Sequence, residues 1–492
     1  MTNAFPFLNG SRRTAKPRPR GITMVIDDGL GINQAQDLVA VGGPYIDLVK
    51  LGWGTSCFFP EELLREKIAL YRDADCLVCP GGTLLEAAHD RGEIPAFFEA
   101  AARYGFNAIE VSNGIDTGID AQVKRDLIKR SVDLGFRTLS EVGRKLPEED
   151  RPLSSEDRIA EVQRDLEAGA FKVIMEARES GTVGIFAANG TVKSDLAYDL
   201  FLHLDPEDII WEAPRKEQQV WLIRQLGEEV NIGNVAPGGL ISLETLRHGL
   251  RGDTFRDHRR NATVVYLELG VNGALRARRR NDVVVMVDAL RVSTTILQVL
   301  AQGARTVRPV VSADELDAGL SIGERGGRKL PNATFGNSPL ELMQADLRDQ
   351  DLLITSTNGT ECIRASKSVD NPVLIGSITN CSAVAKAAES LARRQGRGLT
   401  LLAAGRNNKP AVEDSIGITE ILKRLSAPIT RGVLEPYFSE NIERDFLSSD
   451  SGVNIAGHGY AQDVIFCSAL DRYDIVPSFD GEFIRLLEDG SP

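Results

Sequence analysis

Five carboxylates in the first half of the chain stand at or beside the ends of five different apolar runs. A buried carboxylate without a partner is costly, so several that converge on one pocket must be paired with cations or bound to a metal ion. Oxygen ligands with no histidine nearby favour Mg²⁺ over zinc or copper. We therefore expect a magnesium site in this half. The carboxylates are Asp27, Glu110, Glu141, Glu176 and Glu212.

Three basic residues occupy comparable positions. Lys50, Lys145 and Arg178 also stand at or beside the ends of apolar runs and would supply countercharge to an anionic substrate. Lys145 would also act as a proton donor if burial lowers its pKa. A structural ion-pair network without a catalytic role is the alternative interpretation of these acids and bases.

The elements that must position these residues are eight short β-branched runs, which alternate with helix-length segments. Such runs are typical of parallel strands buried on both faces, and eight units of this kind close into a (β/α)8 TIM barrel. The working face of that fold is formed by the carboxyl ends of the strands, and loops after strands seven and eight commonly bind phosphate. Asn231 and Gly233 in the last run are therefore expected to bind substrate. The expected strands are 21–28, 45–51, 75–80, 108–113, 137–143, 171–177, 208–213 and 229–234.

Bulk properties exclude several classes of protein. A length of 492 residues suits two domains, and the net charge of -13 argues against general nucleic-acid binding. No apolar run reaches the roughly 18 residues that a membrane span needs, so no membrane association is expected. The six cysteines form no dense framework, which fits a cytoplasmic location, and Cys76 and Cys79 are expected to be buried thiols.

The chain is predicted to comprise an arm at 1–20, the barrel at 21–255, a polar linker at 256–261 and a separate α/β domain with a mixed sheet at 262–492. A turn at Asn272-Gly273 and a solvated hairpin flank at Arg276–Arg280 are expected early in the second domain. Its expected strands are 263–267, 283–287, 306–311, 351–356, 372–376, 399–404 and 463–467.

Polar residues in the second half also gather after predicted strands. Asp288, Arg291 and three hydroxyl residues at 293–295 would form a phosphate cradle at a helix N-terminus, with a capped helix as the alternative. Loops rich in hydroxyls and amides can donate several hydrogen bonds to one anion, and grouped acids can hold Mg²⁺. The further candidates are Arg325, Ser338, Thr357, Asn358, Gly359 and Thr360 for substrate, and Glu324, Glu413 and Asp414 for metal.

The first half resembles the phosphosulfolactate synthase family over about residues 20–255. The resemblance implies a (β/α)8 barrel that adds sulfite to phosphoenolpyruvate with Mg²⁺, and Lys145 would protonate the carbon next to the site of attack. The family pattern predicts a lysine at position 28, where this chain has Asp28. The stretches that carry the resemblance are Val49–Ser56, Pro80–Leu84, Ser140–Lys145, Glu176–Ser180, Glu212–Pro214 with Gln218-Gln219, and Ser242–Arg247.

The second half resembles 2-phosphosulfolactate phosphatase over about residues 262–490, which implies Mg²⁺-dependent phosphate hydrolysis. No attacking atom is carried over from that family. The matching stretches are Asp288–Thr295, Gly323–Gly326, Gly336–Pro339, Thr355–Thr360, Asn380, Gly405-Arg406, Glu413-Asp414 and Gly459–Val464.

Together the two resemblances imply a bifunctional enzyme that makes 2-phospho-3-sulfolactate and hydrolyses it to 3-sulfolactate, which in related pathways leads toward coenzyme M or is stored or exported. The expected partners are phosphoenolpyruvate, sulfite and phosphosulfolactate, and a homo-oligomer is expected. Two alternatives stay open. One keeps the barrel chemistry but changes the nucleophile or the phosphorylated acid, and the other is a non-catalytic, stress-associated barrel.

Overall fold

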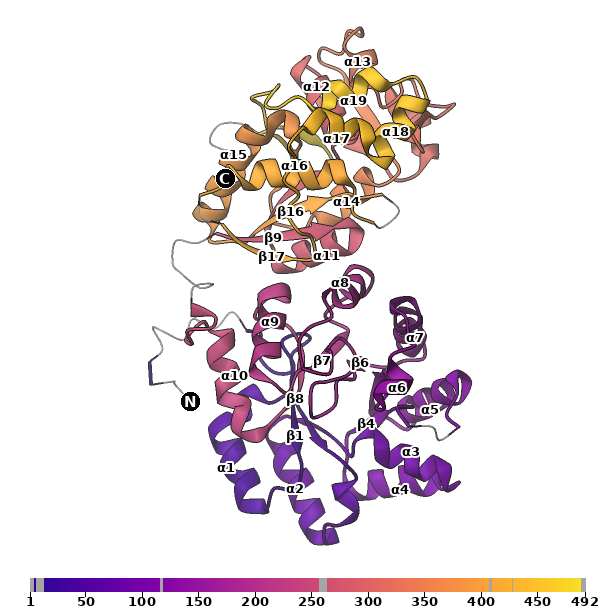
Figure 1. Cartoon of the computed structure of the whole chain (residues 1–492), viewed down its shortest axis with the longest axis vertical. Helices are drawn as coiled ribbons and strands as arrows, with labels where there is room; N and C mark the ends of the chain where they lie inside the picture. Colours follow the sequence, from indigo (N-terminus) through magenta and orange to yellow (C-terminus); the bar gives the residue numbers. More distant parts are fainter. Residues whose placement is uncertain are drawn as a thin grey trace. The chain divides into compact units, whose positions relative to one another are not determined.

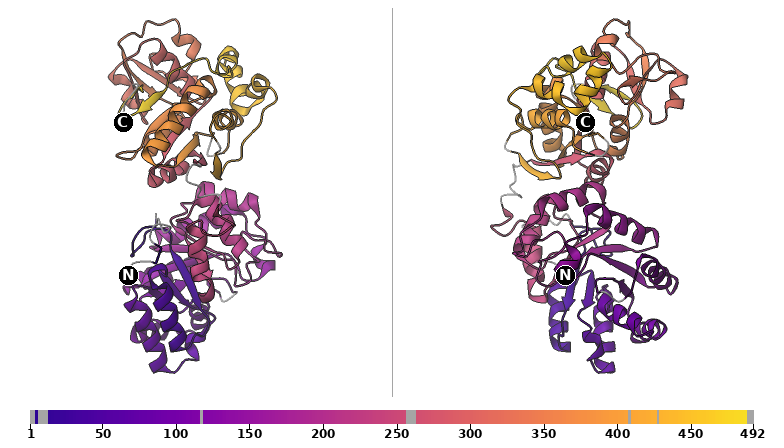
Figure 2. Two further views of the ribbon diagram at one scale, coloured as in Figure 1. Left: turned by 90° about the vertical axis from the view of Figure 1, so that its left-hand side faces the viewer. Right: turned by 45° about the vertical axis from the view of Figure 1, so that its right-hand side comes forward.

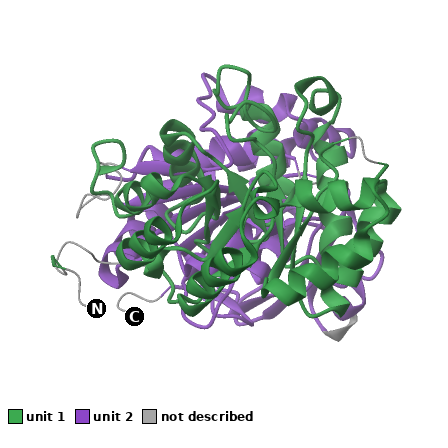
Figure 3. Cartoon of the chain, turned by 90° about the horizontal axis from the view of Figure 1, so that it is seen from below, with its two compact units in different colours: residues 1–259 green, residues 260–492 purple. Residues whose placement is uncertain are grey.

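The computed structural model describes residues 4–5, 13–115, 118–255, 263–406, 409–426 and 428–487. The chain divides into two compact units, residues 1–259 and 260–492, which Figure 3 shows in two colours. The expected linker at 256–261 lies outside the described residues. No helix in the described part of the chain is long and apolar enough to cross a membrane.

The first unit is a barrel of parallel strands with helices around its outside (Figure 1, Figure 2). Its strands pair in the order β3-β2-β1-β8-β7-β6-β5-β4, as the expected (β/α)8 fold requires. The strands are β1 Thr23–Asp27, β2 Leu48–Leu51, β3 Leu77–Cys79, β4 Ala108–Val111, β5 Arg137–Val142, β6 Lys172–Met175, β7 Ile209–Glu212 and β8 Ile232–Val235. The helices are α1 Ile32–Gly42, α2 Glu61–Asp73, α3 Gly82–Asp90, α4 Ile94–Tyr104, α5 Ala121–Asp133, α6 Pro147–Asp150, α7 Ser155–Glu167, α8 Ser194–His203, α9 Lys216–Leu226 and α10 Leu240–Arg247.

A side chain joins β3 to β4, the two ends of this strand order. Asn107 Oδ1 accepts a hydrogen bond from Val78 N at 2.7 Å, and Asn107 Nδ2 donates to the Cys76 carbonyl at 3.2 Å. Cys76 and Cys79 are both buried free thiols, as the sequence predicts. The amide of Asn107 therefore substitutes for part of the backbone ladder where the barrel closes.

The pleat of the strands decides which side chains enter the barrel. One buried apolar layer comprises Ile22, Met24, Leu48, Cys79, Ala108, Leu139, Ile174 and Ile210. Residues two positions further along a strand point to the same face. On β2, β4, β5, β6 and β7 these residues are Lys50, Glu110, Glu141, Glu176 and Glu212. A charged layer thus lies above the apolar layer, at the carboxyl ends of the strands.

Residues 13–20, which the sequence predicts as part of a loose arm, are held against the barrel. Arg18 Nη1 lies 2.9 Å from Asp47 Oδ1, and Arg13 is ion-paired with Glu244. Asp47 precedes β2 and Glu244 lies in α10, so this part of the arm fastens two distant segments of the barrel together.

The second unit is built on a mixed sheet in the order β13-β12-β14-β11-β19-β18-β15-β10-β16-β9-β17. The strands are β9 Val264–Leu269, β10 Val283–Val287, β11 Thr306–Pro309, β12 Ser321–Arg325, β13 Arg328–Lys329, β14 Asp351–Thr355, β15 Val373–Gly376, β16 Leu399–Ala403, β17 Ile429–Gly432, β18 Pro477–Phe479 and β19 Ile484–Leu486. The helices are α11 Gly270–Arg280, α12 Val292–Ala301, α13 Pro339–Leu342, α14 Gly359–Ser366, α15 Cys381–Gln395, α16 Val412–Leu422, α17 Ile442–Ser448, α18 Asp450–Gly457 and α19 Ala461–Cys467.

Helices cover both faces of this sheet. On β10, Val284 and Met286 join the cluster that α11, α12 and α14 bury, whereas Val285 faces the other side, where α15 and α16 pack close to Gly376. Parallel pairing prevails, and the hairpin β18–β19 is antiparallel both within itself and to its neighbours β15 and β11. The mixed sheet predicted from the sequence is confirmed.

Three local predictions in this unit are wrong, and two of them concern secondary structure. The expected turn at Asn272-Gly273 lies inside α11, where a Cβ at Gly273 would come within 2.9 Å of the Glu268 Cβ. The glycine therefore permits close packing of helix on strand. The expected strand at 463–467 is helix α19, because a short apolar run does not by itself distinguish the two structures.

The basic stretch Arg276–Arg280 is the end of α11 and not a solvated hairpin flank. Arg276 Nη2 and Arg280 Nη1 lie 2.6 Å and 3.0 Å from the two carboxylate oxygens of buried Glu268. Arg280 also lies 2.7 Å from Asp282 Oδ2. These arginines are internal countercharges of the second unit.

Candidate active sites

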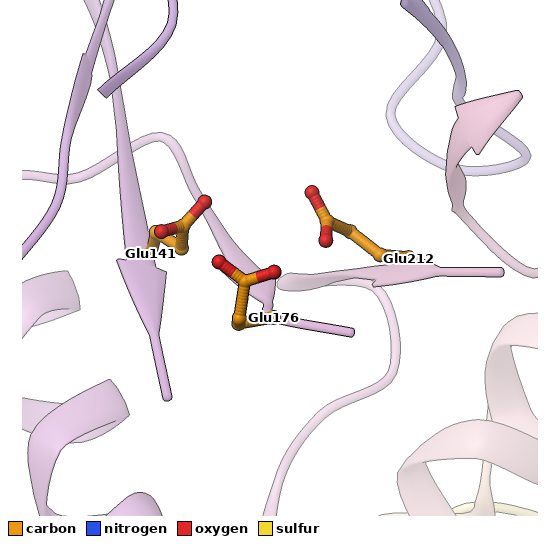
Figure 4. Close-up of side chains that lie close together, drawn as sticks. All are labelled: Glu141, Glu176 and Glu212. Atoms are coloured by element: carbon orange, nitrogen blue, oxygen red, sulfur yellow. The ribbon is translucent and has the colours of Figure 1, made fainter. Parts of the chain in front are cut away.

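Three glutamates at the ends of adjacent strands form the centre of the barrel site. Glu141 lies in β5, Glu176 follows β6, and Glu212 ends β7. One carboxylate oxygen of each residue lies within 4.8 Å of those of the other two. Figure 4 shows the three carboxylates converging on one space. All three side chains are buried, so their charge must be balanced locally.

Lys50 provides one cation of this site. Its Nζ lies 3.0 Å from Glu110 Oε2, 3.3 Å from Glu212 Oε1 and 3.5 Å from Glu141 Oε2. Burial lowers the pKa of Lys50, but these carboxylates raise it by more, so that the pKa lies well above its ordinary value. The ammonium group is therefore a permanent member of the charged layer, so its charge is already matched within the protein.

The carboxylates outnumber the ammonium groups. Burial raises the pKa of Glu110 and Lys50 lowers it; because the effect of burial is larger, the pKa rises to about 7. Burial and the charge of Glu141 raise the pKa of Glu176 well above its ordinary value. Burial acts in the same sense on Glu141, but Lys145 and Lys50 lower the pKa of that residue to about 2. With Glu86, five buried carboxylates thus face two ammonium groups, and this imbalance favours a bound cation.

Lys145 reaches the site from the loop after β5. Its Nζ lies 2.9 Å from Thr83 Oγ1, 3.2 Å from Glu86 Oε1 and 3.4 Å from Glu141 Oε1. Burial lowers the pKa of Lys145, but Glu141 and Glu86 raise it by more, so the net shift is upward. The expectation that burial would lower this pKa is wrong, because the carboxylates keep the amine protonated.

Glu86 is a site residue that the sequence reasoning missed. It lies in the middle of α3 and is fully buried, on the same helix face as Gly82 and Leu85. An acid on the buried face of an amphipathic helix is the signal that would have identified it. Besides the contact with Lys145, its Oε2 accepts a hydrogen bond from Ile115 N at 2.8 Å.

Asp27 does not join the acidic cluster, and its prediction as a metal ligand of that cluster is corrected. Ile26 shares the inward face with Met24, so Asp27, the next residue, points to the helix layer. There its Oδ2 lies 2.9 Å from Lys67 Nζ and accepts a hydrogen bond from Tyr71 at 2.7 Å. The neighbouring Asp28 is exposed.

Asn231 lies at the opposite end of the barrel from the predicted substrate site. It precedes β8, and its Nδ2 donates to the carbonyl of Glu207 at 2.8 Å and that of Ile209 at 3.0 Å. Gly233 is inside the barrel, where a Cβ would lie 2.6 Å from Met24 Cε. The strand begins later than predicted, which moves Asn231 away from the mouth and leaves Gly233 as a packing residue.

Arg178 is present at the mouth but directs its side chain to solvent. Its backbone N donates to Glu176 Oε1 at 2.6 Å, whereas its Nη2 lies 3.7 Å from Glu179 Oε1, with 37% of the Arg178 side chain exposed. Its role as a countercharge for an anionic substrate therefore stays a prediction.

The second unit has a cavity of about 230 Å³ at the carboxyl ends of β10, β12, β14 and β16. The four predicted acids and Arg291 line it together with Thr357 and Asn358. Arg406, which follows β16, lines it as well and was not among the predicted site residues. The loops that form this cavity therefore gather most of the second predicted constellation at one place.

Backbone amides hold two of the cavity acids. Asp414 accepts from Ala289 N at 2.7 Å and from Gly405 N at 2.9 Å, which ties the loops after β10 and β16 together. Glu324 accepts from Thr357 N and from Gly327 N, each at 2.8 Å. These bonds fix the direction of both carboxylates.

The acids of the cavity lie close enough to repel one another. Burial, followed by the charge of Glu324, raises the pKa of Asp288 to about 7. Burial and the charge of Asp288 raise the pKa of Asp414 well above its ordinary value. Glu413 is buried, and among the described residues its Oε2 has no hydrogen-bond partner. Acids under such repulsion favour a cation between them.

Arg291 is anchored in the wall of the cavity. Its Nη1 lies 2.6 Å from Asp463 Oδ2, its guanidinium stacks over the Tyr460 ring at 4.9 Å, and Ser338 Oγ donates to Asp463 Oδ1 at 2.9 Å. Ser338 thus acts on Arg291 through Asp463, and its predicted contact with substrate is replaced by a supporting role.

Arg325 is turned away from the cavity. Its Nη2 donates to the Val311 carbonyl at 3.0 Å and to Thr355 Oγ1 at 3.1 Å, and it does not line the cavity. Its prediction as a substrate-binding residue is corrected, because the pleat of β12 sends it to the face opposite Glu324.

The loop after β14 supplies the remaining predicted residues. Asn358 and Thr357 line the cavity, and Thr357 Oγ1 donates to Glu324 Oε1 at 3.0 Å. A Cβ at Gly359 would lie 2.5 Å from Asp288 Oδ2, so only glycine permits this approach. Thr360 is buried, and its Oγ1 accepts a hydrogen bond from Ser356 N at 3.3 Å, which fixes the turn.

The folds and sites define two α/β enzyme units in one chain. Residues 11–253 match the family described as (2R)-phospho-3-sulfolactate synthase, and residues 272–482 match 2-phosphosulpholactate phosphatase. A phosphosulfolactate synthase of Methanothermobacter thermautotrophicus is 46% identical over 51% of this chain and 97% of its own length. The chain therefore belongs to the phosphosulfolactate synthase family.

The second half has relatives of comparable coverage. A probable 2-phosphosulfolactate phosphatase of Symbiobacterium thermophilum is 31% identical over 42% of this chain and 94% of its own length. The chain therefore belongs to the 2-phosphosulfolactate phosphatase family as well. Among solved structures, 3-hexulose-6-phosphate synthase from Salmonella typhimurium aligns over 48% of this chain and 100% of its own, with 13% identity and a TM-score of 0.34. The two family memberships identify the chain as an enzyme with a synthase unit and a phosphatase unit.

Proposed function

We propose that the barrel adds sulfite to phosphoenolpyruvate in a Mg²⁺-dependent reaction, and that the second unit hydrolyses the resulting 2-phospho-3-sulfolactate to 3-sulfolactate and phosphate. Membership in the two families supports this pair of reactions. The observation that carries the proposal is the convergence of Glu141, Glu176 and Glu212 beside Lys145.

The residues of the barrel mouth fit a magnesium ion. Glu141, Glu176 and Glu212 offer oxygen ligands only, and apart from its ion pair with Lys145 at 3.4 Å, Glu141 Oε1 has no hydrogen-bond partner among the described residues. Carboxylates outnumber ammonium groups at this site, which favours a bound cation. When bound, Mg²⁺ would supply Lewis-acid stabilisation of negative charge on the substrate carboxylate.

Protein groups account for the proton that the addition requires. The sulfur of sulfite forms a bond to the methylene carbon of phosphoenolpyruvate, and the π electrons of the double bond move toward the carboxylate. Lys145, kept protonated by Glu86 and Glu141, gives a proton to the carbon that carries the phosphate. Lys50 stays within the carboxylate layer and holds Glu110 and Glu212 in place.

In the second unit, Asp288, Glu324, Glu413 and Asp414 would hold Mg²⁺, and Arg291 and Asn358 would bind the phosphate oxygens. The carboxylates around Asp288 and the unpartnered Glu413 Oε2 support a cation there. The attacking atom is left unassigned. Fusion keeps the two steps at a fixed ratio and raises the local concentration of the intermediate. We also propose a cytoplasmic location, because the six free cysteines suit a reducing compartment.

Phosphorus NMR on the purified protein tests the proposal. With phosphoenolpyruvate, Mg²⁺ and sulfite, inorganic phosphate should appear, and the variant Asp288→Asn should accumulate a new phosphoester instead. Phosphate that appears equally without sulfite would contradict the synthase step. Turnover with another nucleophile in place of sulfite would favour the altered specificity that Asp28 motivates, and the absence of any turnover would favour a non-catalytic barrel.

A further inference from the structure

Glu86 reaches the barrel site from helix α3, and the acids of the strand ends do not explain its burial. Its side chain is 0% exposed. A buried carboxylate is retained only where several donors compensate it. Its donors therefore indicate what the residue does.

Two of these donors are backbone amides of the loop after β4. Glu86 Oε2 accepts from Ile115 N at 2.8 Å, and Oε1 accepts from Gly114 N at 3.3 Å. Oε1 also accepts a short hydrogen bond from Ser112 Oγ. One carboxylate thus fixes the path of residues 112–115.

Lys145 packs against the same loop. Lys145 N donates to the Gly114 carbonyl at 3.1 Å, and a Cβ at Gly114 would lie 3.0 Å from Lys145 Cε. The stem of the lysine therefore packs against a glycine whose position Glu86 determines. Any larger residue at position 114 would displace the stem.

Glu86 also contacts the ammonium group itself. Glu86 Oε1 lies 3.2 Å from Lys145 Nζ, and Thr83, one helical turn earlier on α3, accepts from the same nitrogen at 2.9 Å. Glu141 Oε1 is the third partner, at 3.4 Å. Two contacts from α3 thus oppose the electrostatic attraction between Lys145 and the strand-end carboxylates.

We propose that Glu86 is a positioning residue that holds the Lys145 ammonium group at the point from which it protonates the substrate. This inference rests on the proposed synthase reaction. Glu86 acts through Lys145 and through the loop 112–115. Its removal should reduce kcat and leave the KM for phosphoenolpyruvate nearly unchanged.

A double-mutant cycle with Glu86→Gln and Lys145→Ala tests the proposal. Glutamine keeps the shape of the side chain, and Glu86→Asp is the second variant should Glu86→Gln not fold. Glu86→Gln should lower kcat by about 10- to 100-fold, in line with the cost of a misplaced catalytic group. In the Lys145→Ala background the same substitution should change kcat by less than about twofold. Glu244→Gln, a buried glutamate in α10, is the matched control and should retain kcat.

Other outcomes separate this inference from the proposed function. An equal loss of kcat in both backgrounds, or an unchanged kcat in Glu86→Gln, would overturn the positioning role while the synthase reaction stands. A wild-type protein without sulfite-dependent turnover would overturn the reaction and this inference with it. An amine-reactive label followed by mass spectrometry gives a readout that needs no turnover. Lys145 should react faster in Glu86→Gln than in wild type, and an equal rate would contradict the proposal.

Discussion

Lys50 Nζ lies 3.0 Å from Glu110 Oε2, in a charged layer that also contains Glu141 and Glu212. The lysine compensates carboxylates that would otherwise repel one another in a buried layer. Its replacement by an apolar residue leaves those charges unmatched. This relationship makes Lys50 a stability residue whose loss a bound divalent cation should partly repair.

Lys50→Met should destabilise the metal-free protein by about 3 kcal/mol, the usual cost of removing one partner of a buried ion pair. Saturating Mg²⁺ should raise the free energy of unfolding more in this variant than in wild type, because the added cation replaces the missing charge. Urea unfolding with and without Mg²⁺ measures both effects. Equal stabilisation of the two proteins would argue against a metal site in this layer.

Glu176→Gln should weaken Mg²⁺ binding to the barrel by about tenfold or more, since one of three converging oxygen ligands becomes a neutral amide. Asp27→Asn is the matched control, because Asp27 is buried at the end of a strand but is bound to Lys67. The control should keep the Mg²⁺ dependence of the synthase rate. Titration of that rate with Mg²⁺ distinguishes the variants, and a similar shift in both would show that the triad is not the metal site.

Lys145→Ala should lower the kcat of the synthase reaction by about 100-fold or more, the usual contribution of a positioned proton donor. The apparent Mg²⁺ affinity should change much less, because Lys145 contacts only Glu141 of the triad. Steady-state kinetics at several Mg²⁺ concentrations give both values. The reverse pattern would make Lys145 a neighbour of the metal site without a role in proton transfer.

Arg406→Ala should lower the rate of phosphosulfolactate hydrolysis by about tenfold or more. Arg406 lines the cavity, and its guanidinium can bind an anion. Arg325→Ala should leave hydrolysis nearly unchanged, since its guanidinium is bound to Val311 and Thr355. Phosphate release from the isolated intermediate compares the two. A larger loss in the Arg325 variant would contradict the description of this cavity.

Glu268→Gln should destabilise the second unit by about 3 kcal/mol at neutral pH, because it removes the buried charge that Arg276 and Arg280 share. Burial acts to raise the pKa of Glu268, but the two arginines outweigh it and lower the pKa below its ordinary value. The stabilisation is therefore present above the unfolded pKa and is lost as pH falls through the lowered folded pKa. Unfolding curves of wild type and variant should converge in acid, and a constant difference would contradict the ion pair.

The sequence predicts the barrel well because each parallel strand is a continuous apolar run with a polar end. It also places Glu110, Glu141, Glu176 and Glu212 correctly at the mouth, since all four share the inward parity of the pleat. Asp27 fails for the same reason, because a single residue of offset sends it to the opposite face. A strand that starts later than its apolar run likewise explains the misplacement of Asn231.

Residues outside strand ends were harder to predict. Glu86 lies within a helix, where an acidic residue is normally a solvated one, and only the burial of its helix face reveals its role. Arg325 and Glu324 are adjacent in sequence, so the motif could not tell which of them enters the cavity. The turn predicted at Gly273 failed because glycine serves close packing as well as chain reversal.

Carbon NMR with phosphoenolpyruvate labelled at its methylene carbon tests the central claim most directly. In the presence of sulfite and Mg²⁺ in D₂O, the vinylic signal should be replaced by that of a saturated carbon bonded to sulfur, with one deuterium on the neighbouring carbon. Glu141→Gln should abolish this change. Persistence of the vinylic signal in the wild-type protein, or its conversion to pyruvate alone, would contradict carbon–sulfur bond formation at the barrel mouth.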